Sequence, residues 1–230
     1  MADPILFVPG LLCTEVLYAP QMTALADHPV MVADHTRQDA IPDIVEDILK
    51  TAPERFSLIG LSMGSYIAMA LLRAAPERVS RVAMIATNAR ADVPEQTKRR
   101  KFLIELARKK NFEKVPHLLY PGFVHEKREN DPALRQIVVD MAIDTGPDAF
   151  VRQQTALIAR IDSRPFLKEI GCPALVVVGD GDRLTPPHLA REIHNLIPGS
   201  RLAVIAGSGH LPTLEEPDQT TAVLKNWLLN

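Results

Sequence analysis

The most constraining feature of this 230-residue chain is the stretch at residues 56–72, in which a serine flanked by glycines separates two apolar runs. The first run, residues 56–59, has the length of a β-strand, and the second stays almost entirely apolar until Pro76 prevents further helix. Between them lies the pentapeptide Gly-Leu-Ser-Met-Gly at residues 60–64. The pattern predicts a strand, a sharp turn and a buried helix, with Ser62 at the tip of the turn.

A turn of this kind needs glycine on both sides of its serine. A strand that reverses abruptly into a helix crowds its own backbone, and Gly60 and Gly64 have no Cβ atom to collide there. The start of the helix also directs the free amide of Met63 at any oxyanion that forms beside the Ser62 hydroxyl. We therefore interpret the segment as a nucleophile elbow. The alternative, a chance match in an ordinary turn, is disfavoured by the strand before it and the helix after it.

Composition and charge give no sign of a specialised partner. Hydrophobic residues make up 47% of the chain, charged residues 23%, and the formal net charge is -2, as in an average globular protein. We expect neither nucleic acid nor a membrane surface as a partner. Because no apolar span reaches the length of a membrane helix and no secretory leader is visible, we expect a cytoplasmic location. Cys13 and Cys172 are too few for a disulfide framework.

Strand-like and helix-like segments alternate through most of the chain. Residues 41–49 carry the i, i+3, i+4 apolar stripe of an amphipathic helix between two apolar runs of strand length. Strict alternation predicts a parallel, doubly wound α/β sheet of about six strands, with right-handed crossovers and helices on both faces. The expected strands are residues 5–8, 30–33, 56–59, 82–86, 174–178 and 202–205.

Residues 91–168 interrupt this alternation, because roughly eighty residues pass without a convincing strand. Their apolar stripes have helical spacing, and the dipeptide Pro121-Gly122 is one of several expected breaks between helices. A segment this long between two strands is too long for a plain loop. We interpret it as a helical cap inserted after the fourth strand, so that residues 1–90 and 169–230 form the α/β core.

Residues that can act together chemically follow three of the expected strands. An open α/β sheet binds its ligands outside the carboxyl ends of its strands, where Ser62, Asp180, Asp182 and His210 all fall. A serine hydroxyl needs a neutral imidazole to accept its proton, and the imidazole needs a carboxylate to fix its tautomer. The order nucleophile, acid, base along the chain therefore predicts a catalytic triad.

In these features the sequence resembles the α/β-hydrolase superfamily, in its capped, esterase-like branch. The resemblance covers almost the whole chain except the cap, and three motifs carry it. They are Gly-Leu-Ser-Met-Gly at 60–64, Gly-Asp-Gly-Asp-Arg-Leu-Thr-Pro at 179–186, and Gly-Ser-Gly-His-Leu-Pro at 207–212, followed by Glu-Glu-Pro at 215–217. The acid of the family occupies the fourth position of the second motif, so the resemblance favours Asp182 over Asp180.

The resemblance also implies an oxyanion hole formed by two backbone amides, those of Met63 and Leu11. The family usually introduces the second donor with His-Gly, whereas this chain has Pro-Gly-Leu-Leu at residues 9–12, without the histidine. The apolar character of this loop predicts that Leu12 lines the substrate site. Cys13 on the same loop is either a modifiable thiol or, as we favour, a small apolar filler.

The segment at residues 90–128 contains eleven Lys and Arg residues against five Asp and Glu residues. The favoured interpretation is a solvated face of the cap. The alternative is an anionic substrate, because menaquinone-pathway members of the family use cap arginines to bind one. In that case Arg152 or Arg160 is expected to contact the substrate.

Together these features predict a serine hydrolase that acts on a small carboxylic ester or lactone through an acyl-enzyme. Two alternatives remain open: the same triad could hydrolyse a C–C bond or eliminate pyruvate from an acidic ketone, or the fold could serve a non-catalytic receptor for a small signal molecule. The remaining histidines have no metal-ligand spacing and are expected to be surface or structural residues. We expect no metal, no cofactor and a small molecule as the only ligand.

Overall fold

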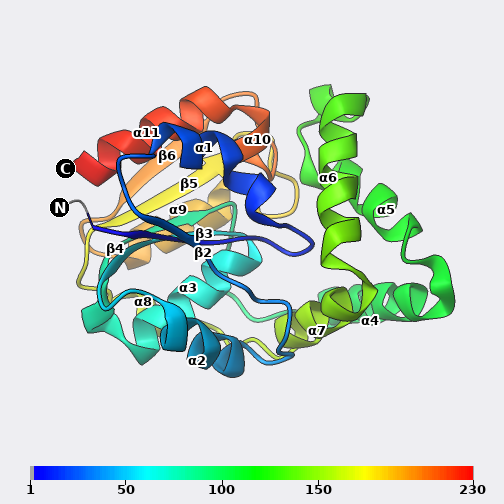
Figure 1. The fold of residues 1–230 in the computed structure, drawn as a ribbon, viewed down its shortest axis with the longest axis horizontal. Helices are drawn as coiled ribbons and strands as arrows, with labels where there is room; N and C mark the ends of the chain where they lie inside the picture. The colour runs from blue at the N-terminus through cyan, green and yellow to red at the C-terminus, as the bar shows by residue number, and fades with distance from the viewer. Residues whose placement is uncertain (1–2, 230) are drawn as a thin grey trace.

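The computed structural model describes residues 3–229, and its centre is a six-stranded sheet with the order β2-β1-β3-β4-β5-β6 (Figure 1). All five neighbouring pairs are parallel, so the predicted sheet is confirmed. The strands are β1 (Ile5–Val8), β2 (Val30–Val32), β3 (Phe56–Leu61), β4 (Val79–Ile85), β5 (Ala174–Gly179) and β6 (Arg201–Ile205).

The inner strands are mainly apolar and largely buried, and β4 is partly exposed at Ser80 and Arg81. All residues of β1, β3 and β5 are buried, whereas the edge strands β2 and β6 are partly exposed. Successive residues of β1 point to opposite faces: Phe7 belongs to one apolar core and Leu6 to the other. Both faces must therefore be covered by helices.

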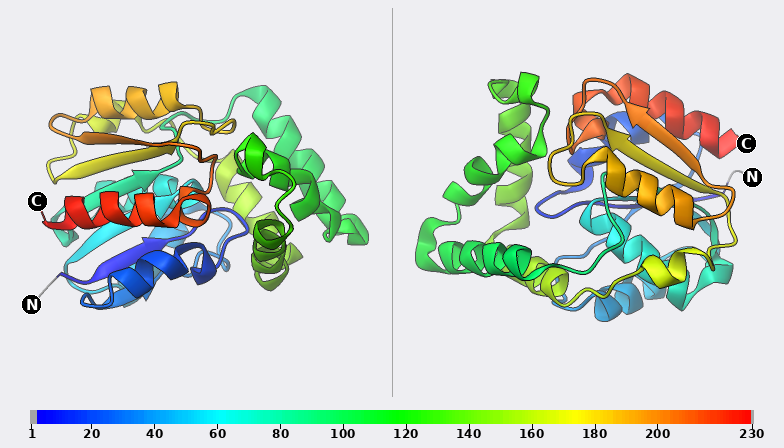
Figure 2. Two further views of the ribbon diagram at one scale, coloured as in Figure 1. Left: turned by 90° about the horizontal axis from the view of Figure 1, so that it is seen from above. Right: turned by 180° about the vertical axis from the view of Figure 1, so that it is seen from behind.

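Helices cover both faces of the sheet, as the alternation predicted (Figures 1 and 2). One apolar core joins the sheet to η1, α1 and α11, and the other joins it to α2, α3, α8 and α9. The bounds of these elements are η1 (Glu15–Tyr18), α1 (Ala19–Ala24), α2 (Ile41–Thr51), α3 (Met63–Ala74), η2 (Pro76–Arg78), α8 (Arg164–Leu167), α9 (Pro187–Leu196), α10 (Pro212–Glu215) and α11 (Pro217–Leu229).

A purely helical segment lies beyond the end of the sheet at which the strands terminate (Figures 1 and 2). In the described chain no strand occurs between β4 and β5. The elements of this segment are α4 (Pro94–Leu106), η3 (Ala107–Asn111), α5 (Lys114–Phe123), η4 (Glu126–Arg128), α6 (Pro132–Thr145) and α7 (Pro147–Ile158). The division into a core and a separate cap domain at residues 91–168 stays a prediction.

One expected break between helices is wrong, because Pro121-Gly122 lies inside α5. Pro121 belongs to the last turn of that helix, so its missing N–H removes a single hydrogen bond shortly before the helix ends at Phe123. Its carbonyl oxygen accepts a hydrogen bond from the Arg183 guanidinium, which belongs to the loop after β5. No helix within residues 3–229 has both the length and the apolar character needed to cross a bilayer.

Candidate active site

Ser62 lies in the sharp turn between β3 and α3, in a backbone conformation that L-residues rarely adopt. Its φ is 54° and its ψ is -112°. A Cβ atom on Gly60 would overlap the carbonyl oxygen of Gly64, and one on Gly64 would overlap that of Val8. Only glycine therefore fits on either side of the serine: at Gly60 because of the turn's own backbone, as expected from the sequence, and at Gly64 because of the neighbouring end of β1.

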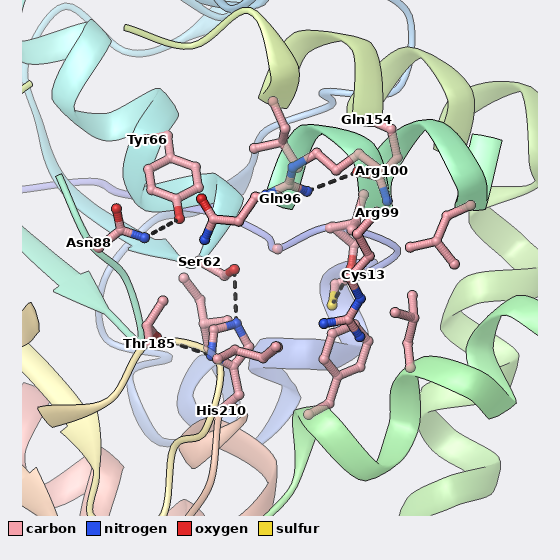
Figure 3. Close-up of a pocket in the computed structure, with 18 of the residues that line it drawn as sticks. Cys13, Ser62, Tyr66, Asn88, Gln96, Arg99, Arg100, Gln154, Thr185 and His210 are labelled. Carbon is pink, nitrogen blue, oxygen red and sulfur yellow. Dashed lines mark hydrogen bonds between the residues drawn. The ribbon is translucent and has the colours of Figure 1, made fainter. Parts of the chain in front are cut away.

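The imidazole of His210 lies between Ser62 and Asp182. Its Nε2 is 2.9 Å from Ser62 Oγ, and its Nδ1 is 2.8 Å from Asp182 Oδ2. Thr185 Oγ1 donates to Asp182 Oδ2 at 2.7 Å, while the amides of Leu184 and Thr185 both donate to Oδ1 at 2.9 Å. Figure 3 shows the Ser62 hydroxyl facing the imidazole. The carboxylate is thus held in one orientation, toward the ring.

Asp182 is held in its charged form despite its position in the protein interior. Burial by itself would raise its pKa, but the charge of His210 and the hydrogen bonds from His210 and Thr185 outweigh burial and hold that pKa below its usual range. An ionised Asp182 favours the tautomer that carries its proton on Nδ1. The Nε2 lone pair then faces the Ser62 hydroxyl and can accept its proton.

The other candidate acid, Asp180, makes its hydrogen bonds with backbone amides and not with the imidazole. Its Oδ1 accepts from the amides of Gly207 at 2.8 Å and Ser208 at 3.3 Å. These amides begin the loop that carries His210. Asp180 therefore holds a turn, whereas Asp182 contacts the imidazole.

A buried carboxylate, Glu215, fixes the backbone on both sides of His210. Its side chain accepts from the amides of Gly209 at 2.9 Å and Leu211 at 3.1 Å, and from His125, just after α5, at 2.7 Å. Glu215 is 1% exposed. The sequence analysis included it only as part of a motif. No signal in the sequence separates it from its neighbours, because Glu216 follows directly and Asp218 lies two residues further on.

The amides of Leu11 and Met63 are free to bind an oxyanion. Leu11 follows β1 and lines the cavity next to Ser62, and Met63 is the first residue of α3. Val8 pairs with Gly60 in the sheet, so the loop after β1 adjoins the turn after β3. Within the described part of the chain, neither amide has a hydrogen-bond acceptor. A helix N-terminus with an unpaired N–H is a site that favours negative charge.

Gln153 and His35, which the sequence analysis did not assign to the site, support the loop after β1. Leu12 has a φ of 60°, and its amide donates to Oε1 of the buried Gln153 of α7 at 3.2 Å. His35, which follows β2, donates through Nε2 to the carbonyl oxygen of Gly10 at 3.2 Å, and burial lowers the pKa of His35. The loop thus lacks a histidine of its own but is held by one from the next loop.

A cavity of about 140 Å³ opens above Ser62 (Figure 3). Its walls are largely apolar and include Leu103, Leu119 and Phe123 from the helical segment. The polar atoms near the serine include those of Tyr66 and Asn88, which are joined by a 2.9 Å hydrogen bond. The size and lining suit a short acyl or alkyl group.

The three residues predicted to contact substrate lie in different surroundings. Arg160 lines the cavity, but Arg152 and Leu12 do not belong to its lining. Arg152 is half-buried and donates through Nε to the carbonyl oxygen of Thr36 at 2.8 Å. Cys13 also lines the cavity; burial raises the pKa of its thiol to about 12, which leaves it protonated and unreactive.

Arg160 belongs to a buried charge cluster behind the cavity. Its guanidinium stacks on the Tyr66 ring at 4.5 Å and donates to Asp92 and to the carbonyl oxygen of Arg90. Asp92 also accepts from Arg100 Nε at 2.6 Å. The side chains of Asp92 and Arg160 are 1% and 3% exposed, so one buried carboxylate compensates two guanidiniums.

Asp92→Asn is expected to lower the free energy of unfolding by about 3 to 5 kcal/mol, because it leaves a buried guanidinium without its counter-charge. Chemical denaturation measures this loss. Glu105→Gln on α4 is the matched control, since Glu105 is 58% exposed and its pair with Arg108 should contribute less than about 1 kcal/mol. Equal effects of the two substitutions would contradict the structural role of Asp92.

Within residues 3–229, no group of three or more His, Cys, Asp or Glu side chains is arranged to hold a metal ion.

Comparisons with known proteins agree with the observed fold. A family model described as the alpha/beta hydrolase fold matches residues 20–217. A Mycobacterium tuberculosis protein that carries the name of a non-heme bromoperoxidase is 30% identical over 192 residues, which cover 78% of this chain and 70% of that protein. A pimeloyl-[acyl-carrier protein] methyl ester esterase of Xanthomonas oryzae pv. oryzae is 29% identical over 231 residues, covering 92% and 89%.

Among solved structures, a thermophilic esterase from Thermogutta terrifontis with malate bound superimposes with a TM-score of 0.90. It is 26% identical to this chain, and the match covers 99% of this chain and 90% of that esterase. The similarity thus extends over the helical segment as well as the sheet.

Proposed function

Because the chain belongs to the α/β hydrolase fold family, we propose that it is a serine hydrolase of small carboxylic esters or lactones, with Ser62 as nucleophile, His210 as base and Asp182 as the residue that orients the base. The observation that carries the proposal is the continuous hydrogen-bonded chain from Ser62 Oγ through His210 to Asp182. The esterases among the similar proteins support the same reaction class.

The first half of the reaction transfers the acyl group to the enzyme. His210 Nε2 takes the hydroxyl proton as Ser62 Oγ attacks the ester carbonyl carbon. The carbonyl oxygen becomes an oxyanion that accepts hydrogen bonds from the Leu11 and Met63 amides, and each such donor is typically worth about 10²- to 10³-fold in rate. Asp182 stabilises the imidazolium. His210 then protonates the leaving alcohol as the C–O bond breaks.

The second half hydrolyses the acyl-enzyme. A water molecule gives its proton to His210 Nε2 and attacks the acyl carbon, and the same two amides stabilise the second oxyanion. Collapse of this intermediate releases the carboxylic acid, and the proton on His210 returns to Ser62 Oγ. The buried Glu215 supports both halves, since it fixes the backbone on either side of the imidazole.

The test is turnover of short 4-nitrophenyl esters together with labelling by a fluorophosphonate, which forms a covalent bond with an activated serine. We expect many turnovers per enzyme and a single labelled residue, Ser62. Cys13 should remain unlabelled, because its raised pKa keeps it a thiol. Release of one equivalent of 4-nitrophenol without further turnover would instead favour the receptor alternative, and labelling elsewhere would refute the assignment of Ser62.

A further inference from the structure

The cavity above Ser62 has an excess of positive charge. Three guanidiniums line it, those of Arg99, Arg100 and Arg160, and among the described residues no aspartate or glutamate belongs to the lining. A concave site lined by one sign of charge concentrates ligands of the opposite sign. The question is therefore which of the three arginines can meet an anion.

Two of the three arginines are already engaged by protein groups. Asp92 accepts from both Arg100 and Arg160, and Arg100 also donates to Gln154 at 2.8 Å. The side chains of Arg100 and Arg160 are 19% and 3% exposed. Their directions are fixed by these bonds, so they shape the wall and supply a background charge rather than a free pair of donors.

Arg99 differs from both of its arginine neighbours in the cavity. Figure 3 shows its side chain reaching from α4 into the cavity on the side of Cys13. Within the described part of the chain it makes no hydrogen bond or ion pair. Arg99 is exposed, so a ligand from solution can reach it. Its guanidinium therefore offers two parallel N–H donors that match the two oxygens of a carboxylate.

The helical phase of α4 separates Arg99 from the lysines beside it. Lys98 and Lys101 are exposed and do not line the cavity. Only Arg99 and Arg100 of this basic run face the site, and only Arg99 is unpaired. The simpler interpretation of residues 98–101 is a charged face in contact with solvent. It accounts for the two lysines but not for an arginine directed into the cavity above a serine nucleophile.

We propose that Arg99 binds a carboxylate of the substrate, so that the enzyme prefers esters carrying a free carboxylate over neutral esters of the same shape. This inference rests on the proposed hydrolase function and names its substrate class. The background charge from Arg100 and Arg160, only partly balanced by Asp92, strengthens the binding of an anion at the same site.

Two 4-nitrophenyl esters of glutaric acid test the proposal, one with the second carboxyl group free and one with it methylated. They share one acyl skeleton and one leaving group and differ in one charge and one methyl group. We expect the wild-type enzyme to prefer the free acid, and Arg99→Gln to reduce this preference, the ratio of the two kcat/KM values, by about 10- to 100-fold, as for loss of a charge-assisted hydrogen bond.

Lys98→Gln is the matched control, because it removes one charge from the same turn of α4 outside the cavity. It should leave the preference within about twofold of wild type, the usual effect of an exposed charge. Equal losses in Lys98→Gln and Arg99→Gln would mean that only long-range charge acts, and would overturn the proposal. A wild-type preference for the methylated ester, or an unchanged preference in Arg99→Gln, would also overturn it.

Binding of glutarate itself separates this inference from the proposed function. Glutarate should bind wild-type protein, measured by calorimetry, and binding should weaken about 10-fold or more in Arg99→Gln. If neither ester were hydrolysed while glutarate still bound through Arg99, the hydrolase proposal would fail and the anion site would stand. If both esters were hydrolysed at equal rates and glutarate did not bind, the anion site would fail and the hydrolase proposal would stand.

Discussion

Ser62→Ala is expected to lower kcat for 4-nitrophenyl esters by at least about 10³-fold while the protein stays folded, because the reaction loses its nucleophile and the side chain makes no packing contact that the fold needs. Ser62 Oγ has a single protein partner within 3 Å, the imidazole nitrogen that would accept its proton. Steady-state kinetics and a thermal unfolding curve measure both halves of the expectation.

Ser62→Gly provides a second variant that separates chemistry from stability. At a φ of 54° and a ψ of -112° a side chain stores strain of about 1 to 3 kcal/mol, and glycine removes it at an entropic cost of up to about 1 kcal/mol. This inactive variant should therefore unfold at a higher denaturant concentration than Ser62→Ala. Residual turnover above about a hundredth of wild type in either variant would contradict the role of Ser62.

The sheet and the elbow could be predicted from the sequence because their signals are local. The apolar runs that become β1 and β5 are unbroken, and that of β3 contains one polar residue, Ser57, as expected of strands buried on both faces. The need for glycine at 60 reflects a collision with Gly64, four residues along the chain, whereas the collision at Gly64 is with Val8 of the neighbouring strand. The chain order of Ser62 and His210 with an intervening aspartate then restricts the site to one edge of the sheet.

The supporting residues could not be predicted, because their partners lie far away in the sequence. Gln153 reaches the amide of Leu12 across 141 residues, and the Glu215 carboxylate reaches the amide of His125 across 90. Neither residue has a spacing pattern that identifies its role. A buried polar side chain is recognised by its donors and acceptors, and these are set by how the helical segment packs against the sheet.

The arginines of the helical segment show the same limit on a smaller scale. Nothing in the sequence is a reason to prefer Arg152 or Arg160 as a substrate contact. In the structure only Arg160 of the two lines the cavity, and its guanidinium is paired with Asp92. Arg99, which the sequence analysis did not single out, is the arginine of the cavity lining that has no hydrogen bond or ion pair within residues 3–229. The directions of these side chains depend on helix phase and on the position of Asp92. A count of charged residues in the sequence contains neither kind of information.

Asp182→Asn is expected to lower kcat by about 10³- to 10⁴-fold with little change in KM, because the carboxylate sets the tautomer of the imidazole rather than binding substrate. The asparagine amide would donate to His210 Nδ1, which would place the ring proton on Nε2, toward Ser62. A serine hydroxyl cannot transfer its proton to a nitrogen that is already protonated. Steady-state kinetics with a neutral 4-nitrophenyl ester measures the loss.

Asp180→Asn is the matched control, since it makes the same change two residues earlier in the same loop. The asparagine carbonyl oxygen can still accept from the amides of Gly207 and Ser208, so the turn keeps its hydrogen bonds and kcat should fall by less than about tenfold. Both aspartates follow β5 in one motif, so the sequence motif alone separates them only by position. An orienting carboxylate acts through the imidazole, whereas a turn carboxylate acts only through the backbone. A greater loss of kcat in Asp180→Asn than in Asp182→Asn would therefore identify Asp180 as the orienting residue.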